Sequence, residues 1–245
     1  MSVVLVTGAS RGIGAAVALA CARAGHDVAV NFARDHVAAG TVVASIQALG
    51  RRALAVRADV ADEAQVHSMF EQVDAQLGRL DHLVNNAGIV VPSARLEEQD
   101  LARWQRVFGV NVMGTLLCCR EAARRMSSKR GGAGGCIVNL SSRAAVHGSP
   151  NLYVDYAASK AAIDALTVGL AKELIGEGIR VNGLRPGVIA TEIHAESGVD
   201  LQAAVAGIPI GRLGTAEEIA EGVLWLLSPA SSYCVGTILD VAGGR

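Results

Sequence analysis

Aromatic residues are scarce in this sequence. They make up 3% of its 245 residues, whereas 51% of the residues are hydrophobic. A core so poor in large rings does not suit a β-sandwich, but many Ala, Val and Gly suit helices packed closely on a parallel sheet. A chain of this length can bury one sizeable core. The composition therefore indicates an α/β protein with a single domain over residues 1–245.

Blocks of like charge and long apolar runs are also absent from the sequence. The formal net charge is -1 with a pI near 6.6, and no cluster of Lys and Arg is long enough to bind a phosphate backbone or an anionic membrane. No uninterrupted run of about 18 apolar residues occurs, and the first residues lack the basic start and apolar stretch of a leader peptide. We therefore expect a soluble, cytoplasmic protein that binds neither nucleic acid nor membranes.

Cysteine and histidine show no ligand pattern. The five cysteines form no C-x-x-C pair and no even framework, which favours a reducing compartment, and Cys118 and Cys119 are expected in an apolar helix within the core. The six histidines lack metal-ligand spacing, although His147 and His194 fall in loops near the expected substrate entrance. No metal site is predicted.

Short apolar runs alternate with longer amphipathic stretches along the whole chain. The apolar runs predict seven strands, at residues 3–6, 27–32, 53–58, 82–84, 136–140, 180–184 and 237–241. The stretches between them predict helices at residues 14–24, 37–49, 63–77, 101–126, 156–175 and 216–227. Such alternation predicts a doubly wound parallel sheet with helices on both faces, a Rossmann-type three-layer sandwich.

A glycine-rich turn joins the first expected strand to the first expected helix. Residues 7–14 read Thr-Gly-Ala-Ser-Arg-Gly-Ile-Gly, a G-x-x-x-G-x-G spacing. Glycines let a backbone approach a pyrophosphate closely, and a helix N-terminus offers free N–H groups to it. The turn predicts a dinucleotide site that includes Gly8, Ser10, Arg11, Gly12, Ile13 and Gly14, although a tight strand-to-helix connection would use the same glycines.

The end of the second expected strand bears on the choice of nucleotide. An acidic residue there would bind a free ribose hydroxyl, but this chain has Asn31 and, shortly after it, Arg34. Arg34 and Arg11 could form a charged fork around a 2′-phosphate. NADP(H) is therefore favoured and NAD stays possible, since Arg34 could also be a solvated charge that Asp35 neutralises.

Tyr156 and Lys160 are spaced for chemistry. Four residues apart, they lie on one face of the expected helix. A phenol with an ordinary pKa near 10 is a poor base at neutral pH, but an adjacent cation favours the phenolate. The pair is the minimum that a Tyr acid/base mechanism needs, and it also arises by chance on amphipathic helices.

An ordered set of motifs along nearly the whole chain resembles the short-chain dehydrogenase/reductase family. Its members here are Thr7-Gly-x-x-x-Gly-x-Gly14, Asp59-Val60, Asn85-Asn-Ala-Gly88, Asn111, Ser141-Ser142, Tyr156-x-x-x-Lys160, Pro186-Gly187 and Thr191. The resemblance implies the doubly wound fold and an oxidoreductase that passes hydride between a nicotinamide and a carbonyl carbon.

The resemblance also implies roles for individual residues. Tyr156 would be the general acid/base, Lys160 would lower its pKa and hold the nicotinamide ribose, Ser142 would polarise the carbonyl, and Asn111 would support a proton-relay water. Ser141 and Ser142 end a strand whose alternation sends them to opposite faces, so one of them can be catalytic, and the family pattern favours Ser142. The implied contacts to the nucleotide come from Asp59, Val60, Asn86, Ala87, Gly88, Pro186, Gly187, Val188 and Thr191.

The substrate is less defined by the sequence. Residues 192–213 follow the Pro-Gly turn and are expected to form a lid, but they carry no cationic cluster that would demand an acidic substrate. The family includes 3-oxoacyl-thioester reductases, sugar dehydrogenases and broad carbonyl reductases, and a catalytically inactive nucleotide-binding regulator is a further alternative. Tyr153, which lacks a cation four residues on, is expected either in the wall of the substrate pocket or as a packing residue. By family habit we expect a homotetramer.

Overall fold

The computed structural model describes residues 2–191 and 205–245. Within them, a 7-stranded parallel sheet has the order β3-β2-β1-β4-β5-β6-β7, which confirms the predicted doubly wound topology. The strand order reverses between β1 and β4, where folds of this kind place their ligands. The strands are β1 (Val3–Val6), β2 (Asp27–Phe32), β3 (Ala53–Arg57), β4 (Leu80–Asn85), β5 (Gly135–Leu140), β6 (Ile179–Pro186) and β7 (Ile238–Val241).

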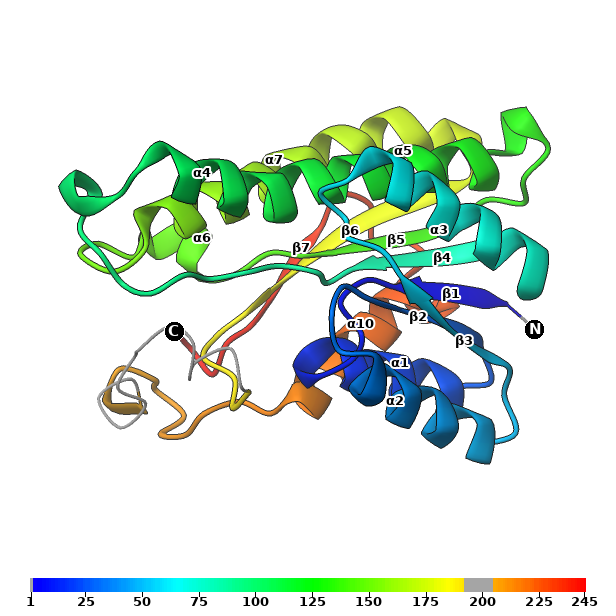
Figure 1. The fold of residues 1–245 in the computed structure, drawn as a ribbon, viewed down its shortest axis with the longest axis horizontal. Helices are drawn as coiled ribbons and strands as arrows, with labels where there is room; N and C mark the ends of the chain where they lie inside the picture. Colours follow the sequence, from blue (N-terminus) through cyan, green and yellow to red (C-terminus); the bar gives the residue numbers. More distant parts are fainter. Residues whose placement is uncertain (1, 192–204) are drawn as a thin grey trace.

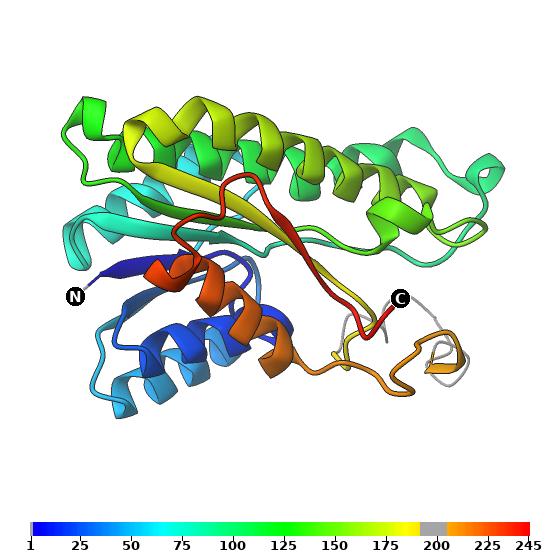
Figure 2. The same cartoon turned by 180° about the vertical axis from the view of Figure 1, so that it is seen from behind.

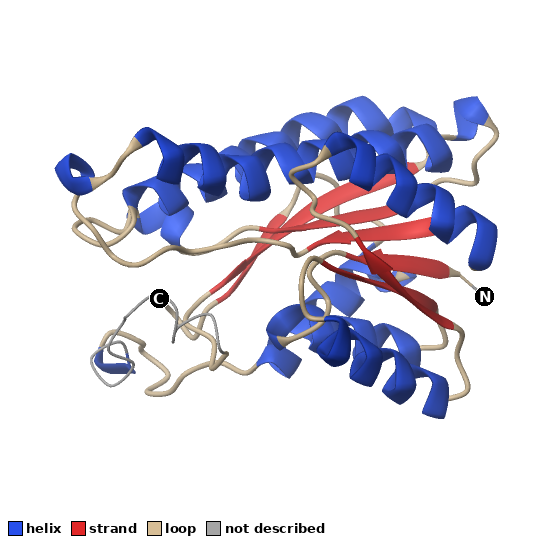
Figure 3. Cartoon of the chain, viewed as in Figure 1, coloured by secondary structure: helices blue, strands red, loops and turns tan. Residues whose placement is uncertain are grey.

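Helices cover both faces of the sheet (Figures 1 and 3). On one face lie α1 (Gly12–Arg23), α2 (His36–Ala48) and α10 (Ala216–Leu227). On the other face lie α3 (Glu63–Gln76), α4 (Leu101–Phe108), α5 (Gly114–Met126) and α7 (Val154–Leu174), with the short α6 (Ala144–His147) beside the start of α7. Strand β7 forms an edge of the sheet and faces the viewer in Figure 2.

Alternation along the central strand builds two separate cores. Val4 and Val6 of β1 pack in the cluster under α1 and α10, whereas Val3 and Leu5 pack in the cluster under α3, α5 and α7. Because successive side chains of a strand point to opposite faces, a strand that is apolar at every position needs cover on both sides. The continuous valine and leucine run of β1 therefore accounts for its central place in the sheet.

The predicted single helix over residues 101–126 is wrong in one respect. Helices α4 and α5 are joined by a π-helical turn, Gly109–Met113, in which the N–H of Gly114 donates to the carbonyl of Gly109. Gly114 lies against Val60, so closely that a Cβ there would come 2.7 Å from Val60 Cγ2. Apolar periodicity continues through the turn and hides it in the sequence, but π turns are rare and often mark functional sites.

A buried polar ladder ties α7 to the sheet. Asn85 Nδ2 donates to Asn139 Oδ1 at 2.9 Å, and Asn139 Nδ2 donates to Thr167 Oγ1 at 3.0 Å. These side chains come from β4, β5 and α7, and all three are buried. Buried polar networks of this kind help to fix the arrangement of the elements that they join. The ladder therefore sets how α7 lies over the ends of β4 and β5.

The first turn of α1 is packed against the glycine loop so closely that it leaves no room for a side chain. A Cβ on Gly14 would lie 2.3 Å from the carbonyl oxygen of Gly8 and 2.5 Å from Asn86 Nδ2. Gly14→Ala should therefore lower the free energy of unfolding by about 1 to 3 kcal/mol, measured by urea denaturation.

The matched control for this substitution is Gly40→Ala in α2, where an added Cβ meets nothing within 4 Å. Alanine is the better helix former, so this variant should gain about 0.5 to 1 kcal/mol. Equal effects of the two substitutions would contradict the close packing at Gly14.

Candidate active site

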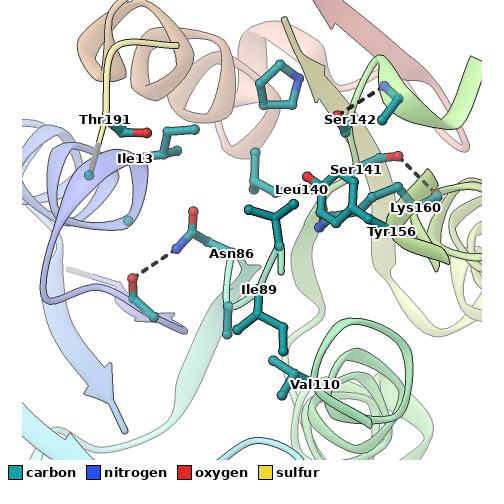
Figure 4. A pocket seen from close by; sticks show the side chains of 18 of the residues that line it. Ile13, Asn86, Ile89, Val110, Leu140, Ser141, Ser142, Tyr156, Lys160 and Thr191 are labelled. Atoms are coloured by element: carbon teal, nitrogen blue, oxygen red, sulfur yellow. Dashed lines mark hydrogen bonds between the residues drawn. The ribbon is translucent and has the colours of Figure 1, made fainter. Parts of the chain in front are cut away.

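One large pocket lies at the carboxyl ends of β1, β4, β5 and β6 (Figure 4). Its volume of about 1110 Å³ exceeds that of most small-ligand sites, and it can hold a dinucleotide together with a substrate. Three of the predicted catalytic residues, Ser142, Tyr156 and Lys160, line it. The predicted cofactor residues that line it are Gly8, Ser10, Arg11, Gly12, Ile13, Gly14, Asn31, Arg34, Asp59, Val60, Asn86, Ala87, Gly88, Tyr156, Lys160, Pro186, Gly187, Val188 and Thr191.

The glycine loop is held by a clasp between Thr7 and Asn86. Thr7 Oγ1 accepts hydrogen bonds from the backbone N–H groups of Asn86 and Ala87, both at 3.0 Å. In return, Asn86 Nδ2 donates to the carbonyls of Thr7 at 2.9 Å and Gly8 at 3.0 Å. The Asn86 side chain therefore holds the glycine loop in shape. A nucleotide would contact the backbone next to Asn86.

The residues of the loop fit a pyrophosphate. Gly8 and Gly12 have φ of +62° and +55°, a conformation that favours glycine. Helix α1 begins at Gly12, its N-cap Arg11 makes no side-chain capping hydrogen bond, and its first turn holds no acidic residue. The N–H groups and positive dipole end of α1 therefore face the pocket ready for an anion.

Asn31 has a structural role that the sequence does not reveal. It is 1% exposed, its Nδ2 donates to the carbonyls of Val56 and Ala58, and its Oδ1 accepts from the N–H of Gly8. These bonds use its polar atoms to join the end of β2 to β3 and to the glycine loop. Asn31 lines the pocket as a support of the loop, and its amide is already committed to the backbone.

Two exposed arginines stand at this end of the pocket. Arg34 follows β2 and Arg11 belongs to the glycine loop, and both line the cavity. Asp35, which could have neutralised Arg34, instead caps α2 by accepting a hydrogen bond from the N–H of Ala38 at 2.9 Å. The arrangement suits a phosphate between two guanidinium groups.

Tyr156, Lys160 and Ser142 meet at the other end of the pocket (Figure 4). Helix α7 carries Tyr156 and Lys160 on one face, and the Lys160 Nζ lies 5.8 Å from the centroid of the Tyr156 ring. That Nζ donates to the carbonyl of Leu140 at 2.8 Å. Ser142, just past β5, forms a side-chain hydrogen bond with Tyr156.

The pKa of Tyr156 is shifted by its surroundings. Burial raises it to about 12, while the hydrogen bond from Ser142 lowers it in part and the nearby Tyr153 phenol raises it. The pKa of Lys160 moves the other way, to about 8, because burial disfavours the ammonium more than Asp164 favours it. Lys160 is not among the causes of the Tyr156 shift, and its ammonium donates to the carbonyl of Leu140, so the implied lowering of the phenol pKa by Lys160 stays a prediction.

The two serines at the end of β5 take different places, as strand alternation predicts. Ser141 is buried, and its Oγ donates to the carbonyl of Lys160 at 3.0 Å. Ser142 faces the pocket, where its Oγ also accepts from the N–H of Ala144 at 3.1 Å. Ser142 is thus the serine beside Tyr156, and Ser141 helps to hold α7 against the strand.

Asn111 lies behind the pocket wall and is 1% exposed. Its Oδ1 accepts from the N–H of Ile89 at 2.8 Å, and its Nδ2 donates to the carbonyl of Ile89 and to Ser159 Oγ. The π-helical turn carries this side chain, which joins the segment after β4 to α7. Asn111 therefore positions the part of the pocket wall that includes Gly88 and Lys160.

Tyr153 lines the pocket, and its ring stacks edge-on against Tyr156 with centroids 5.6 Å apart. Several other residues of the pocket were not predicted from the sequence. Arg245 was not expected, because no recognisable pattern in the sequence brings it to the pocket. Residues 192–204 of the expected lid, with His194, lie outside the described residues. The further lining residues that were missed include Ile89, Val90, Gln105, Arg106, Gly109 and Val110.

Other features of the described residues bear on the class of protein. In the ranges 2–191 and 205–245, no helix is both long and apolar enough to cross a membrane. Over the same ranges, no group of three or more His, Cys, Asp or Glu side chains could hold a metal ion. Cys118 and Cys119 are buried free thiols in the core, as expected, and burial raises the pKa of Cys119 to about 12.

Comparison with known proteins agrees with this geometry. A family model described as enoyl-(acyl carrier protein) reductase matches residues 8–245. The chain is 49% identical, over the full length of both proteins, to the uncharacterized oxidoreductase YgfF of Escherichia coli K12. It is 42% identical to cis-4-hydroxycyclohexanecarboxylate dehydrogenase of Sinomonas cyclohexanicum, with 99% of this chain and 95% of that protein covered.

Solved structures show the same fold at high similarity. A short-chain type dehydrogenase/reductase from Mycobacterium marinum superposes with a TM-score of 0.92 at 39% identity, covering 99% of this chain and 94% of that one. A short chain dehydrogenase from Burkholderia cenocepacia in complex with NADP gives 0.91 at 36% identity, covering 99% and 97%. The chain belongs to the short-chain dehydrogenase/reductase family and is an NAD(P)-dependent oxidoreductase.

The buried Lys160 charge gives a pH-dependent stability. Its pKa is lowered from 10.5 to about 8, so the cost of burying the ammonium is fully present below about pH 8 and is gone by about pH 10.5. Lys160→Met removes that cost at every pH. Its stability relative to wild type should therefore fall by roughly 3 kcal/mol as pH rises through this window, measured by urea denaturation.

Lys172→Met, at an exposed lysine of the same helix, serves as the control. Its stability relative to wild type should not change with pH. A flat difference for Lys160→Met as well would mean that Lys160 titrates like an ordinary lysine.

Proposed function

We propose that this enzyme interconverts a carbonyl and a secondary alcohol with NADP(H), using the Tyr156 phenol as the general acid/base. The observation that carries the proposal is the convergence of Ser142 and Lys160 on Tyr156, in the same pocket as a glycine loop that fits a pyrophosphate. A structural protein would need neither feature. An inactive nucleotide-binding regulator would need the loop alone, so the arranged Tyr156, Ser142 and Lys160 disfavour it.

The raised pKa of Tyr156 suits the reductive direction. With the phenol pKa at about 12, Tyr156 holds its proton at neutral pH and can donate it to the oxygen of a carbonyl. The Ser142 hydroxyl, beside the phenol, would donate a second hydrogen bond to that oxygen and stabilise the charge developing on it. The bound cofactor supplies the hydride. Once the proton has left, the ammonium of Lys160, 5.8 Å from the centroid of the Tyr156 ring, would favour the phenolate.

The proposed preference for NADP(H) rests on Arg34 and Arg11. Both are exposed and line the pocket, and the end of β2 carries Asn31 where a carboxylate would bind a ribose hydroxyl. The Burkholderia cenocepacia relative binds NADP, which supports the choice. NAD stays possible as a weaker cofactor.

The substrate is proposed as a small carbonyl compound, with 3-oxoacyl thioesters and sugars as the alternatives that the family suggests. The Sinomonas cyclohexanicum relative, a hydroxycyclohexanecarboxylate dehydrogenase by name, favours a compact secondary alcohol. Residues 192–213 stay the proposed lid, and 1–245 the proposed single domain.

A cytoplasmic homotetramer is proposed for the assembly. Large apolar side chains are exposed on the outer helices and near the last strand, which is where such chains commonly associate. These side chains are Leu101, Met113, Leu116, Val168, Trp225, Tyr233 and Val235.

Tyr156→Phe tests the acid/base role. It removes the proton donor and keeps the ring, so kcat for NADPH-dependent reduction of ketones should fall by about 10²- to 10⁴-fold, whereas NADPH binding measured by fluorescence titration should be retained. Tyr233→Phe, at a tyrosine that is 102% exposed, is the matched control and should behave as wild type. Wild-type turnover by Tyr156→Phe would remove Tyr156 from the mechanism.

Arg34→Ala tests the cofactor choice. Loss of a charge-assisted contact to the 2′-phosphate should weaken NADPH binding by about 10- to 100-fold and leave NADH binding unchanged. Arg130→Ala, at an exposed arginine outside the pocket, is the control. If NADPH and NADH lost affinity equally, the 2′-phosphate would not be what Arg34 recognises.

A further inference from the structure

A positive charge stands at the substrate end of the pocket. Arg245 lines the cavity together with Tyr153 and His147, far along the sequence from the arginines of the nucleotide end. Its charge lowers the pKa of His147 and opposes the burial that raises the pKa of Tyr153. Arg245 therefore acts electrostatically on the residues around the reacting Tyr156.

The backbone before Arg245 is folded to bring it there. Gly243 and Gly244 have φ of +63° and +91°, and the N–H of Arg245 donates to the carbonyl of Ala242 at 3.2 Å, which closes a turn. The turn is packed tightly, because a Cβ on Gly243 would lie 2.7 Å from Ile210 Cγ2. The carbonyl of Gly243 also accepts from the N–H of Ile210 at 3.1 Å. Arg245 is thus placed by the segment that follows β7 (Figure 2).

Besides Arg245 and the arginines of the nucleotide end, the cations that line the pocket are Arg106, Arg143 and Lys160. Arg143 is engaged by Asp240, with Nη1 and Oδ2 2.7 Å apart. The pKa of His147 is lowered by burial and then by Arg143 and Arg245, so its ring is neutral at neutral pH. Among the described residues that line the pocket, the carboxylates are Asp35 and Asp59, and both belong to the nucleotide end.

We propose that the substrate carries a carboxylate remote from its reacting carbonyl, and that the Arg245 guanidinium and the Tyr153 hydroxyl bind this carboxylate. A guanidinium binds a carboxylate through charge-assisted hydrogen bonds that can be bidentate. The Tyr153 and Tyr156 rings are neighbours, with centroids 5.6 Å apart, so a carboxylate bound at the Tyr153 hydroxyl would lie beside the reacting group and not at it. The carboxylate therefore lies several bonds from the carbonyl, as in oxo acids of the levulinate type.

This inference rests on the proposed carbonyl reduction, and it goes against the sequence-based expectation of no cation for an acidic substrate. That expectation concerned residues 192–213, whereas the cation belongs to the segment after β7, which packs against Ile210. A guanidinium also keeps its charge at every working pH, so recognition of the carboxylate would not titrate with the enzyme.

The test compares levulinate, the next two longer oxo acids and their methyl esters as substrates with NADPH. Wild type should reduce at least one acid better than its ester. In Arg245→Met, kcat/KM for that acid should fall by about 10- to 100-fold through KM, while the ester changes by less than about twofold. Arg245→Lys should recover part of the loss, and Arg23→Met, at an exposed arginine of α1 outside the pocket, should match wild type.

Calorimetric titration of the same acids into the NADP⁺-saturated protein gives a readout that does not need turnover. Binding that weakens in Arg245→Met and survives in Arg23→Met supports the proposal. Equal binding by Arg245→Met and wild type, or an ester reduced as well as its acid by wild type, overturns it. Failure of both esters and acids to be reduced, with no NADPH binding, would instead overturn the proposed function itself.

Discussion

The clasp between Thr7 and Asn86 is the interaction on which the rest of the site depends. It joins β1 to β4 where the strand order reverses, and it uses a threonine hydroxyl and an asparagine amide to pair backbone groups that the diverging chains leave without strand partners. The glycine loop can then turn with positive φ, α1 can begin at its end, and β4 can lead into Gly88. Without that closure, neither the nucleotide end nor the wall in front of Asn111 would hold its shape.

The fold could be predicted from the sequence because its signals are local. Each strand is a short apolar run, and each helix that crosses the sheet follows one, so periodicity and order fix a parallel doubly wound sheet. The grouping of Tyr156 with Lys160 is equally local, since four residues make one helical turn. The separation of Ser141 from Ser142 follows from strand alternation in the same way.

What escaped prediction depends on contacts between distant segments. The burial of Asn31 follows from the carbonyls of Val56 and Ala58 on the next strand, and no pattern around Asn31 shows it. The pKa shift of Tyr156 depends on how deeply the phenol is buried and on its neighbours Ser142 and Tyr153, which the fold brings together. Arg245 reaches the pocket through a turn whose packing partner, Ile210, is remote in sequence.

The π-helical turn at Gly109–Met113 rotates the side chains of α4 about the helix axis relative to those of α5. Because the turn closes with a bond from residue 114 to residue 109, one residue more than an α-turn uses, the two halves of this rod are rotated by about 100° relative to a straight helix. Asn111 occupies that extra turn and points at Ile89. Removing one residue here would restore a continuous α-helix, and it would rotate the side chains of α4 away from their present partners. The π-helical turn thus changes which side chains of α4 and α5 lie on the same face, a change that the sequence alone does not reveal.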